Sequence, residues 1–407
     1  MRQINGDSSN RAVLQYKIKN ELIADLTHRF SLYGYQEVHS PTFEDYDMYA
    51  SIRKTVNKDD MIKVIDRTGK VLVLRPDGTI PITRLTATDP GIDDSEQRLF
   101  YVFNVYRAAE NGEKETTQAG VELFGNKRPE ADAEVISLAV ETLKGIGFEN
   151  FTIEIGHAGF FKELIGKADL AADDLQQLKE LIQTKNIVEI EPFLEKLPLS
   201  AELQNALQTI PLLYGAPKTV LEETKSIIRN ENMQQIFNNM MHVMDVLEDY
   251  GVLGNITLNL GLINHMDYYT DVIFQGFVEN IGKPVLMGGR YDDLAEHFGK
   301  RMPAIGFAYE VDFLLEAMKR HQLTATNPIQ APLALHYSEE RRRDAFAAAE
   351  MLRQRGYPVV TMLTDEQKEK SGIWMSENRN LFSYGKTKSF HTFEDLMELV
   401  DETFGGG

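Results

Sequence analysis

The stretch LFYVFNVYRAAENGEKETTQAGVELFG, residues 99–125, is the part of the sequence that indicates the fold most directly. Two runs rich in β-branched and aromatic residues, 99–104 and 121–124, flank a polar loop that contains glycine, which is typical of a β-hairpin. The runs 62–66 and 71–74 repeat this arrangement around a shorter connection. Strands joined in this way pair antiparallel, and an antiparallel sheet can pack helices on one face and leave the other for a ligand.

Helical patterns lie on both sides of this region. Apolar residues recur at a four-residue spacing within 16–33, which predicts an amphipathic helix that ends at Gly34. A second helix is predicted over about 131–144, with Gly145 as its stop. From about 160 to 250, strand patterns give way to segments rich in Leu, Lys, Glu and Gln, which predict a helical insertion.

Strand patterns return after residue 250, and the sequence predicts a second domain near the C-terminus. A segment of linker composition, 324–332, precedes a strand–helix–strand–helix pattern. Thr364 would cap the second helix of this pattern, and one more helix would follow it at the end of the chain. We therefore predict an α+β fold. Its larger domain, 1–323, has a mainly antiparallel sheet flanked by helices, and a small α/β domain covers 331–404.

The composition narrows the possible functions. The 407 residues include 43 Lys and Arg against 62 Asp and Glu, a net charge of −19, which disfavours nucleic-acid binding because that usually needs cations to neutralise phosphates. Cys is absent, which excludes disulfides, thiolate catalysis and Cys-ligated zinc, and the nine His show no ligand-like spacing. With neither an apolar leader nor an apolar run of about 18 residues, we expect a cytoplasmic protein.

Residues 74–79, Leu-Arg-Pro-Asp-Gly-Thr, place a turn at the end of a predicted strand. The turn presents Asp77, and Gly78 permits close approach of the backbone to a ligand. A plain turn with Thr79 as a helix N-cap explains the same residues. The segment alone leaves both interpretations open.

Gln118 and Glu122 are predicted to share one face of a strand, because positions separated by an even number lie on the same side. Gly120 lies between them and would leave room for a ligand. An amide and a carboxylate directed at one spot suit an ammonium group. Two polar groups on an exposed strand face are the alternative.

Two further segments are candidates. Tyr268 and Tyr269, between predicted strands, would either frame an aromatic pocket or lie on opposite sides of a sheet. Gly288-Gly289-Arg290 is interpreted as a tight turn near a ligand, although this pattern is weak by itself.

Taken in order, these segments resemble the catalytic domain of histidyl-tRNA synthetases, a family of class II synthetases. Residues 34–44 resemble its dimer-forming motif 1, 74–79 its Arg-Pro-Glu-Gly-Thr with Asp77 in place of Glu, and 305–314 its motif 3. The resemblance covers most of 10–320 and implies a class II synthetase fold. It implies a histidine site made of Asp77, Thr79, Arg107, Gln118, Glu122, Tyr268 and Tyr269. Arg107 stands where motif 2 has an ATP-contacting Arg, and would bind an anion or the histidine carboxylate.

The departures from that family concern its cations. Asn264 stands where the synthetase has a catalytic Arg, and Phe313 stands where motif 3 has its Arg. The motif 2 loop is short and acidic at 110–115. Adenylation builds negative charge in its transition state, and losing one preorganised donor typically costs roughly 10²–10³ in rate. We therefore do not expect the chain to activate an amino acid, and expect no catalytic residue.

A synthetase-like chain that keeps the amino-acid pocket without these arginines resembles the regulatory subunits of ATP phosphoribosyltransferase. That resemblance implies a hetero-octamer with the short catalytic subunit at the first step of histidine biosynthesis, a homodimer through the synthetase-like domain, and feedback regulation by L-histidine. It implies neither a cofactor or metal nor tRNA or membrane binding, and it makes 331–404 a reduced anticodon-binding domain.

Two alternatives remain at this point. One is an enzyme, either a divergent histidyl-tRNA synthetase or another histidine-activating ligase. The other is a free-standing histidine sensor, or a structural dimer with a vestigial pocket.

Overall fold

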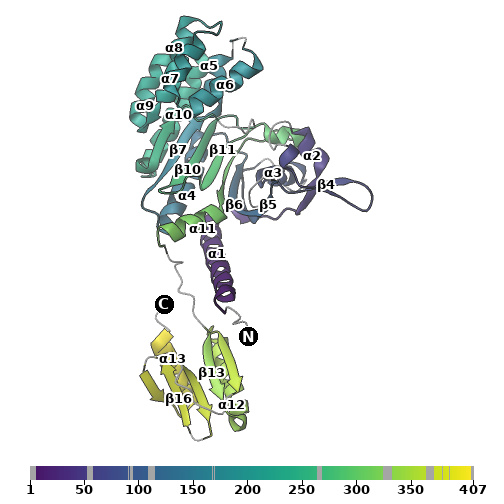
Figure 1. Ribbon diagram of the computed structural model, residues 1–407, viewed down its shortest axis with the longest axis vertical. Helices are drawn as coiled ribbons and strands as arrows, with labels where there is room; N and C mark the ends of the chain where they lie inside the picture. The colour runs from purple at the N-terminus through teal and green to yellow at the C-terminus, as the bar shows by residue number, and fades with distance from the viewer. Residues whose placement is uncertain are drawn as a thin grey trace, which may run out of the picture. The chain divides into compact units, whose positions relative to one another are not determined.

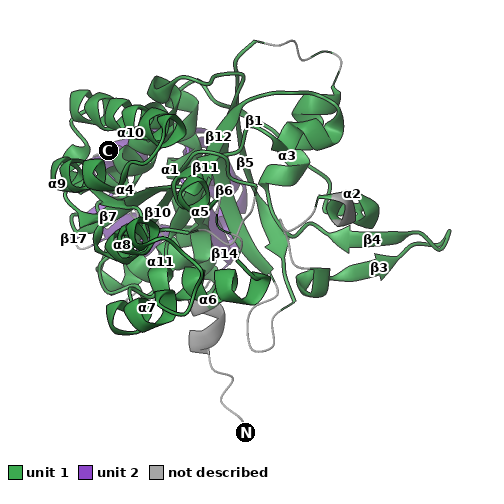
Figure 2. Ribbon diagram, turned by 90° about the horizontal axis from the view of Figure 1, so that it is seen from above, with its two compact units in different colours: residues 1–326 green, residues 327–407 purple. Residues whose placement is uncertain are grey.

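The chain divides into two compact units in the computed structural model, Met1–Thr326 and Asn327–Gly407 (Figure 2). The structure describes residues 6–52, 58–89, 91, 95–108, 115–166, 168, 170–263, 268–323, 332–363, 371–377, 379–384 and 386–404. The predicted Thr364 cap, Asn264 and the acidic loop 110–114 lie outside these residues. In the described part of the chain, none of the helices has the length and hydropathy that a membrane span requires.

The first unit is built on a nine-stranded sheet with the order β1-β5-β6-β12-β11-β10-β7-β9-β8 (Figure 1). All neighbours pair antiparallel except β1 with β5 and β7 with β9. The strands are β1 (Gln36–Glu37), β5 (Gln97–Tyr106), β6 (Glu115–Phe124), β7 (Phe151–His157), β8 (Tyr214–Gly215), β9 (Ile256–Asn259), β10 (Val272–Val278), β11 (Leu286–Arg290) and β12 (Ala304–Glu310). The predicted mainly antiparallel sheet is confirmed.

The central hairpin of β5 and β6 is longer than the apolar runs that predicted it. The strands pair from Gln97 opposite Phe124 to Tyr106 opposite Glu115. The polar residues that begin β6 pair as strand because Gln118 and its neighbours are buried between β5 and β12. The first half of β6 was not predicted as strand, because its residues are polar and polar residues usually indicate loops.

Three helices cover one face of the sheet: α1 (Gly6–Leu32), α4 (Pro129–Ile146) and α11 (Val311–Arg320). Their apolar side chains, such as Phe30 and Val135, join those of Val121 and Phe307 in the main core. The prediction that helix α4 stops at Gly145 is wrong. The helix ends at Ile146, and Gly147 is its C-cap at φ 103°. Gly145 instead accommodates Arg29, whose guanidinium lies 2.3 Å from where a Cβ would be.

The opposite face carries smaller elements and a separate apolar cluster. These elements are the sheet β2-β4-β3 (Phe43–Asp45, Val71–Leu74 and Lys63–Ile65), α2 (Tyr46–Ser51), α3 (Thr79–Thr88), η1 (Lys58–Asp60) and η5 (Leu294–Phe298). Their cluster includes Ile80 and Leu294 and contacts Tyr101, Phe103 and Tyr291 of the large sheet region. This is the face on which the sequence places its candidate ligand residues.

Between β7 and β9 the described chain is helical except for β8. This helical region coincides with the segment that the sequence predicts to be a helical insertion. Its elements are α5 (Ala158–Ile165), α6 (Ala172–Gln183), α7 (Ile187–Leu194), α8 (Ala201–Thr209), η2 (Ile210–Leu212), α9 (Pro217–Thr224), η3 (Lys225–Ile227), α10 (Glu231–Asp249) and η4 (Leu253–Asn255). Helix α10 packs against α4 and α5, so this region is joined to the main core.

The second unit is a five-stranded sheet with the order β14-β13-β15-β16-β17. Its elements are β13 (Leu333–Tyr337), η6 (Glu339–Arg341), α12 (Arg342–Gln354), β14 (Val359–Leu363), β15 (Gly372–Ser376), β16 (Arg379–Tyr384), β17 (Lys386–Ser389) and α13 (Phe393–Phe404). Strands β15, β16 and β17 were not predicted from the sequence, because polar residues interrupt their short apolar runs.

Candidate functional site

The register of the sheet fixes which residues face the candidate site. Gln118, Gly120 and Glu122 of β6 are paired with Glu310, Ala308 and Gly306 of β12, and with Phe103, Tyr101 and Leu99 of β5. Paired residues lie on the same side of a sheet, and alternate residues of one strand do so too. These nine positions therefore form one surface, called the ligand face below.

Glu122 is the centre of a buried hydrogen-bond cluster on the ligand face. Its side chain is 1% exposed. Its Oε1 accepts a hydrogen bond from Thr79 Oγ1 at 2.8 Å, and its Oε2 accepts one from the Tyr291 hydroxyl. Only glycine fits opposite it at position 306, because a Cβ there would lie 1.8 Å from Glu122 Oε2.

Two carboxyl groups of the cluster have raised pKa values. Burial raises the pKa of Glu122 to about 8, against the effect of its two hydroxyl donors. Burial likewise raises the pKa of Asp77 to about 6, although the Ile80 N–H, 2.8 Å from Asp77 Oδ1, and the Arg107 guanidinium favour its charged form. The Asp77 carboxylate adds to the rise in the pKa of Glu122, because like charges disfavour each other. Both groups thus change charge close to neutral pH, which is a common property of functional sites.

The space over Gly120, which the sequence predicts to be open for a ligand, is filled by the Tyr101 ring. A Cβ on Gly120 would lie 2.5 Å from that ring, and one on Gly78 would lie 2.3 Å from it. Tyr101 is fully buried and stacks on Phe103, with ring centroids 4.4 Å apart. The glycines therefore admit an aromatic wall of the site instead of the ligand.

Gln118 makes its contact at the other end of the ligand face. Its Nε2 donates to Glu310 Oε1 at 2.7 Å, and its side chain is 6% exposed. Glu310 was not among the predicted site residues, although it lies within the segment that resembles motif 3. Only the pairing of β6 with β12, nearly two hundred residues later, brings it to the site.

Arg75 and Arg107, which lie close to the Glu122 cluster, differ in their roles. Arg75 is bound to backbone: its guanidinium donates to Ser40 O at 2.6 Å and Asn104 O at 2.9 Å and lies 3.6 Å over the Phe103 ring. Arg107 donates through Nε to Pro76 O at 2.8 Å, and its charge acts on Asp77. Arg75 is therefore a structural residue, whereas Arg107 lies close to Asp77.

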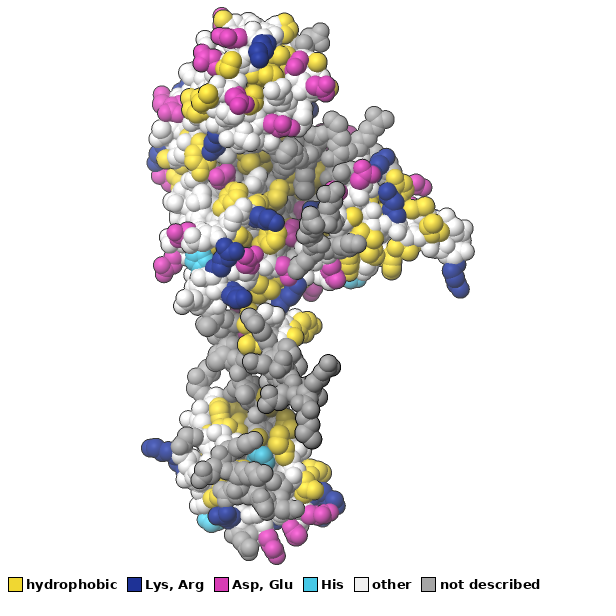
Figure 3. All heavy atoms as spheres, viewed as in Figure 1, with side chains coloured by type: hydrophobic (Ala, Val, Ile, Leu, Met, Phe, Trp, Pro, Cys, Tyr) yellow, Lys and Arg dark blue, Asp and Glu magenta, His cyan; other side chains and the backbone are white. Residues whose placement is uncertain are grey.

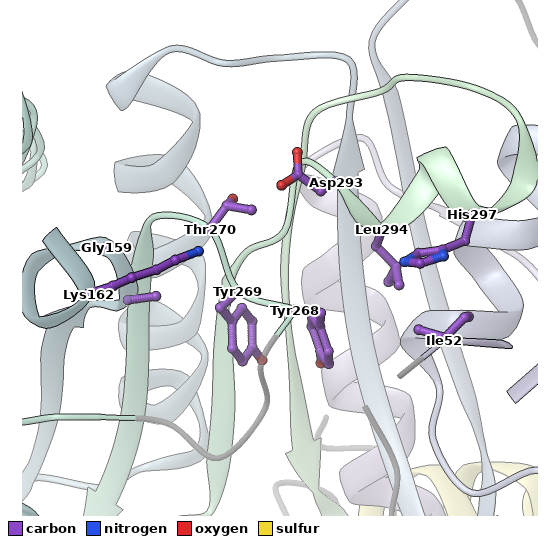
Figure 4. A pocket seen from close by; sticks show the side chains of 10 residues that line it. Ile52, Gly159, Lys162, Tyr268, Tyr269, Thr270, Asp293, Leu294 and His297 are labelled. Carbon is purple, nitrogen blue, oxygen red and sulfur yellow. The ribbon is translucent and has the colours of Figure 1, made fainter. Parts of the chain in front are cut away.

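Tyr268 and Tyr269 lie together, with ring centroids 4.6 Å apart, and Tyr268 meets the Tyr291 ring edge-on at 5.9 Å. They therefore join the Glu122 cluster through Tyr291. On their other side they line a pocket of about 280 Å³, where their side chains lie between Lys162 and His297 (Figure 4). The two tyrosines, called the tyrosine wall below, thus line this pocket and also contact Tyr291 of the Glu122 cluster.

The interpretation of Gly288-Gly289-Arg290 as a turn is wrong, because these residues end strand β11. Arg290 is buried and donates through Nε to Asp132 Oδ1 at 2.8 Å. Its carbonyl accepts from the Thr270 N–H at 2.8 Å, and that bond holds the segment that follows Tyr269. Arg290 therefore positions the backbone next to Tyr269 through this hydrogen bond. Its partner Asp132 is distant in sequence, and no local sequence pattern indicates that the two residues pair.

The described residues contain no group of three His, Asp or Glu placed to hold a metal ion. The cluster offers carboxyl, hydroxyl and amide groups, which together suit a ligand with several N–H donors, such as an ammonium or an imidazole. Arg107 adds a cation at the Asp77 side, where an anionic group of the same ligand would be favoured.

The raised pKa of Glu122 predicts a pH-dependent stability. Since the folded protein holds this proton more tightly than the unfolded chain, the stabilisation is complete below the ordinary pKa and is lost as pH rises to about 8. Chemical denaturation of wild type and Glu122→Gln should show that wild type loses more unfolding free energy, by several kcal/mol, between about pH 5 and about pH 8. Parallel pH profiles of the two proteins would contradict the assignment.

Comparisons with known proteins identify the family of the chain. A model of the histidyl-tRNA synthetase family matches residues 14–314. The ATP phosphoribosyltransferase regulatory subunit of Oceanobacillus iheyensis is 44% identical over 349 residues, which cover 85% of each chain. The protein of the same description from Acetivibrio thermocellus is 36% identical over 333 residues, covering 81% of this chain and 79% of that one.

Solved structures share the fold. A crystal structure described as an ATP phosphoribosyltransferase regulatory subunit/histidyl-tRNA synthetase from Bacillus halodurans has a TM-score of 0.79 at 31% identity, covering 89% of this chain and 94% of that chain. A histidyl-tRNA synthetase from Nostoc has a TM-score of 0.79 at 16% identity, covering 96% of each chain. The predicted class II synthetase-like α+β fold is confirmed.

Proposed function

The chain belongs to the family of ATP phosphoribosyltransferase regulatory subunits, which share the fold of histidyl-tRNA synthetase, and we propose that it is the non-catalytic subunit that activates the short catalytic subunit and makes it sensitive to histidine. The observation that carries the proposal is a ligand face on which Thr79 donates to Glu122 and Gln118 donates to a further carboxylate, Glu310. Such a face suits an amino acid and opposes a polyphosphate.

The arginine and lysine side chains near the ligand face are poorly placed to meet the phosphates of ATP. Arg75 is held by backbone carbonyls and by the Phe103 ring. On α11, the position that corresponds to the motif 3 Arg is Phe313, which has Lys283 5.3 Å from its ring centroid. Phosphoryl chemistry needs cations around the transferred group. Among the described residues, Arg107 beside Asp77 and Lys162 in the pocket at the tyrosine wall supply only part of that charge, so we propose that this chain does not activate histidine.

We propose that L-histidine binds against Glu122, Gln118 and the tyrosine wall. Glu122 and Tyr291 would receive the imidazole, Gln118 the ammonium group, and Arg107 the carboxylate. The complete proposed set is Asp77, Thr79, Arg107, Gln118, Glu122, Tyr268 and Tyr269, to which the hydrogen bond with Glu122 adds Tyr291.

The partner we propose is the short catalytic subunit of ATP phosphoribosyltransferase, in a cytoplasmic hetero-octamer built on homodimers of this chain. Apolar side chains on the first unit support contact with other chains. Leu32 is 66% exposed at the end of α1, and Phe43 and Ile65 of the sheet β2-β4-β3 are 53% and 72% exposed. Hydrophobic side chains gather over that projecting sheet (Figure 3), and patches of this kind commonly mark protein interfaces.

Regulation in this proposal is allosteric. A ligand shifts a complex between two states only by its different affinity for them, so histidine must bind the inactive state of the complex more tightly. By reciprocity, the catalytic substrates must then weaken histidine binding to the complex.

Two measurements test the proposal. Light scattering of this chain mixed with a short catalytic subunit should show one hetero-oligomer, whereas separate species would contradict the partnership. The purified chain should also give no histidine-dependent exchange between ATP and pyrophosphate. Exchange above the level of a heat-inactivated sample would favour a divergent synthetase instead.

A further inference from the structure

Glu310 is held in a fixed place beside the proposed histidine site. It is half-buried at the end of β12, directly opposite Gln118. Its backbone N–H donates to Val285 O at 2.9 Å. Two residues on, Asp312 accepts from the Thr117 N–H at 2.9 Å and pairs with Lys19 at 2.7 Å. Strand pairing and these bonds fix the backbone on both sides of Glu310.

The contact between Gln118 and Glu310 sets the direction of the Gln118 amide. A carboxamide donates from its nitrogen and accepts at its oxygen, whereas an ionised carboxylate only accepts. The amide nitrogen must therefore face Glu310, at the observed 2.7 Å, and Gln118 Oε1 must face away from it. Because Gln118 is 6% exposed, water does not readily supply alternative partners.

An ammonium group is the ligand group that this pair recognises. It has three donors and no acceptor, so it requires oxygen atoms such as Gln118 Oε1 and the carboxylate of Glu310. A neutral or anionic group at the same place would meet only acceptors and a negative charge. The pair lies four residues along β6 from Glu122, so the two ends of the ligand face recognise different parts of the ligand.

We propose that Glu310 is the residue that makes the site specific for the α-ammonium group, by orienting the Gln118 amide and by adding a carboxylate to that end of the ligand face. The inference rests on the proposed function, since it concerns the same histidine site. It adds a residue that the resemblance to synthetases does not imply.

Calorimetry with two ligands tests the inference. Wild type, Glu310→Gln and the control Glu316→Gln, an exposed residue that pairs with Arg320 on α11, are each titrated with L-histidine and with imidazolepropionate, which lacks the ammonium group. Glu310→Gln should weaken histidine binding about 10- to 100-fold, the range expected for a hydrogen bond to a charged group. Its affinity for imidazolepropionate should stay the same or increase, and the control should match wild type.

The outcomes separate the inference from the proposed function. If wild type binds histidine and Glu310→Gln weakens both ligands equally, or neither, Glu310 has no role in specificity and the inference is wrong. If wild type binds no histidine, the proposed site itself is contradicted. A second variant, Gln118→Met, should lose the same selectivity, and the double variant should lose little more, because the two residues act together.

Discussion

Glu122→Ala is expected to reduce the affinity of the chain for L-histidine by up to about 100-fold, judged from the cost of removing a buried hydrogen-bond partner. The substitution removes the carboxyl group that accepts from both the Thr79 and Tyr291 hydroxyls, and it leaves both without this described acceptor. Calorimetry at neutral pH measures the effect.

Two controls protect this result from a folding defect. Glu141→Ala removes an exposed carboxylate that pairs with Lys144 at 3.0 Å, and should bind histidine like wild type. Glu122→Gln keeps the shape of the side chain and should still bind histidine at least tenfold more weakly. Wild-type affinity in the folded glutamine variant would show that Glu122 supports the structure without binding the ligand.

The largest effect on stability is expected from Arg290→Ala. Arg290 and Asp132 are 2% and 1% exposed, and removing one partner leaves the other charge buried without compensation. Breaking such a pair typically costs about 3–5 kcal/mol, which lowers the melting temperature of a protein this large by roughly 5 °C. Thermal unfolding followed by circular dichroism measures the shift.

Replacing both members of the pair distinguishes stability from specificity. Arg290→Met combined with Asp132→Leu removes both charges and should restore most of the lost stability, because a buried ion pair often contributes little beyond apolar packing. A single variant as stable as wild type would contradict the buried pair. Because Arg290 O accepts from the Thr270 N–H, weakened histidine binding in a folded variant would further indicate that the pair positions the tyrosine wall.

Local patterns in the sequence predicted most of what lies within one hairpin or helix. The β5–β6 hairpin, helix α4 and the shared face of Gln118 and Glu122 follow from alternation and from apolar spacing. The buried polar half of β6 did not, since polar residues are buried there only through their pairing with distant strands.

The parts of the site that sequence reasoning missed all depend on long-range register. Glu310 reaches Gln118, and Gly306 reaches Glu122, only because β12 pairs with β6. Arg290 was interpreted as a turn residue because its glycine neighbours usually mark turns. The same glycines are tolerated in β11, which is buried at its end beside Asp132.

The tyrosine wall also connects the site to the helical region after β7. Asp271, next to Thr270, pairs with His157 at 2.5 Å and accepts from Asn239 of α10 at 3.2 Å. Asp271 lies two residues after Tyr269, so the segment that carries the two tyrosines is anchored to β7 through His157 and to α10 through Asn239.

The central claim is that this chain regulates a catalytic subunit and does no chemistry of its own. The most direct test is the rate at which a short ATP phosphoribosyltransferase catalytic subunit forms its product, measured alone, with this chain, and with this chain plus L-histidine. The account predicts a rate that rises when the chain is added and falls again with histidine, with the fall weakened in Glu122→Gln. A rate unchanged by the chain would contradict it.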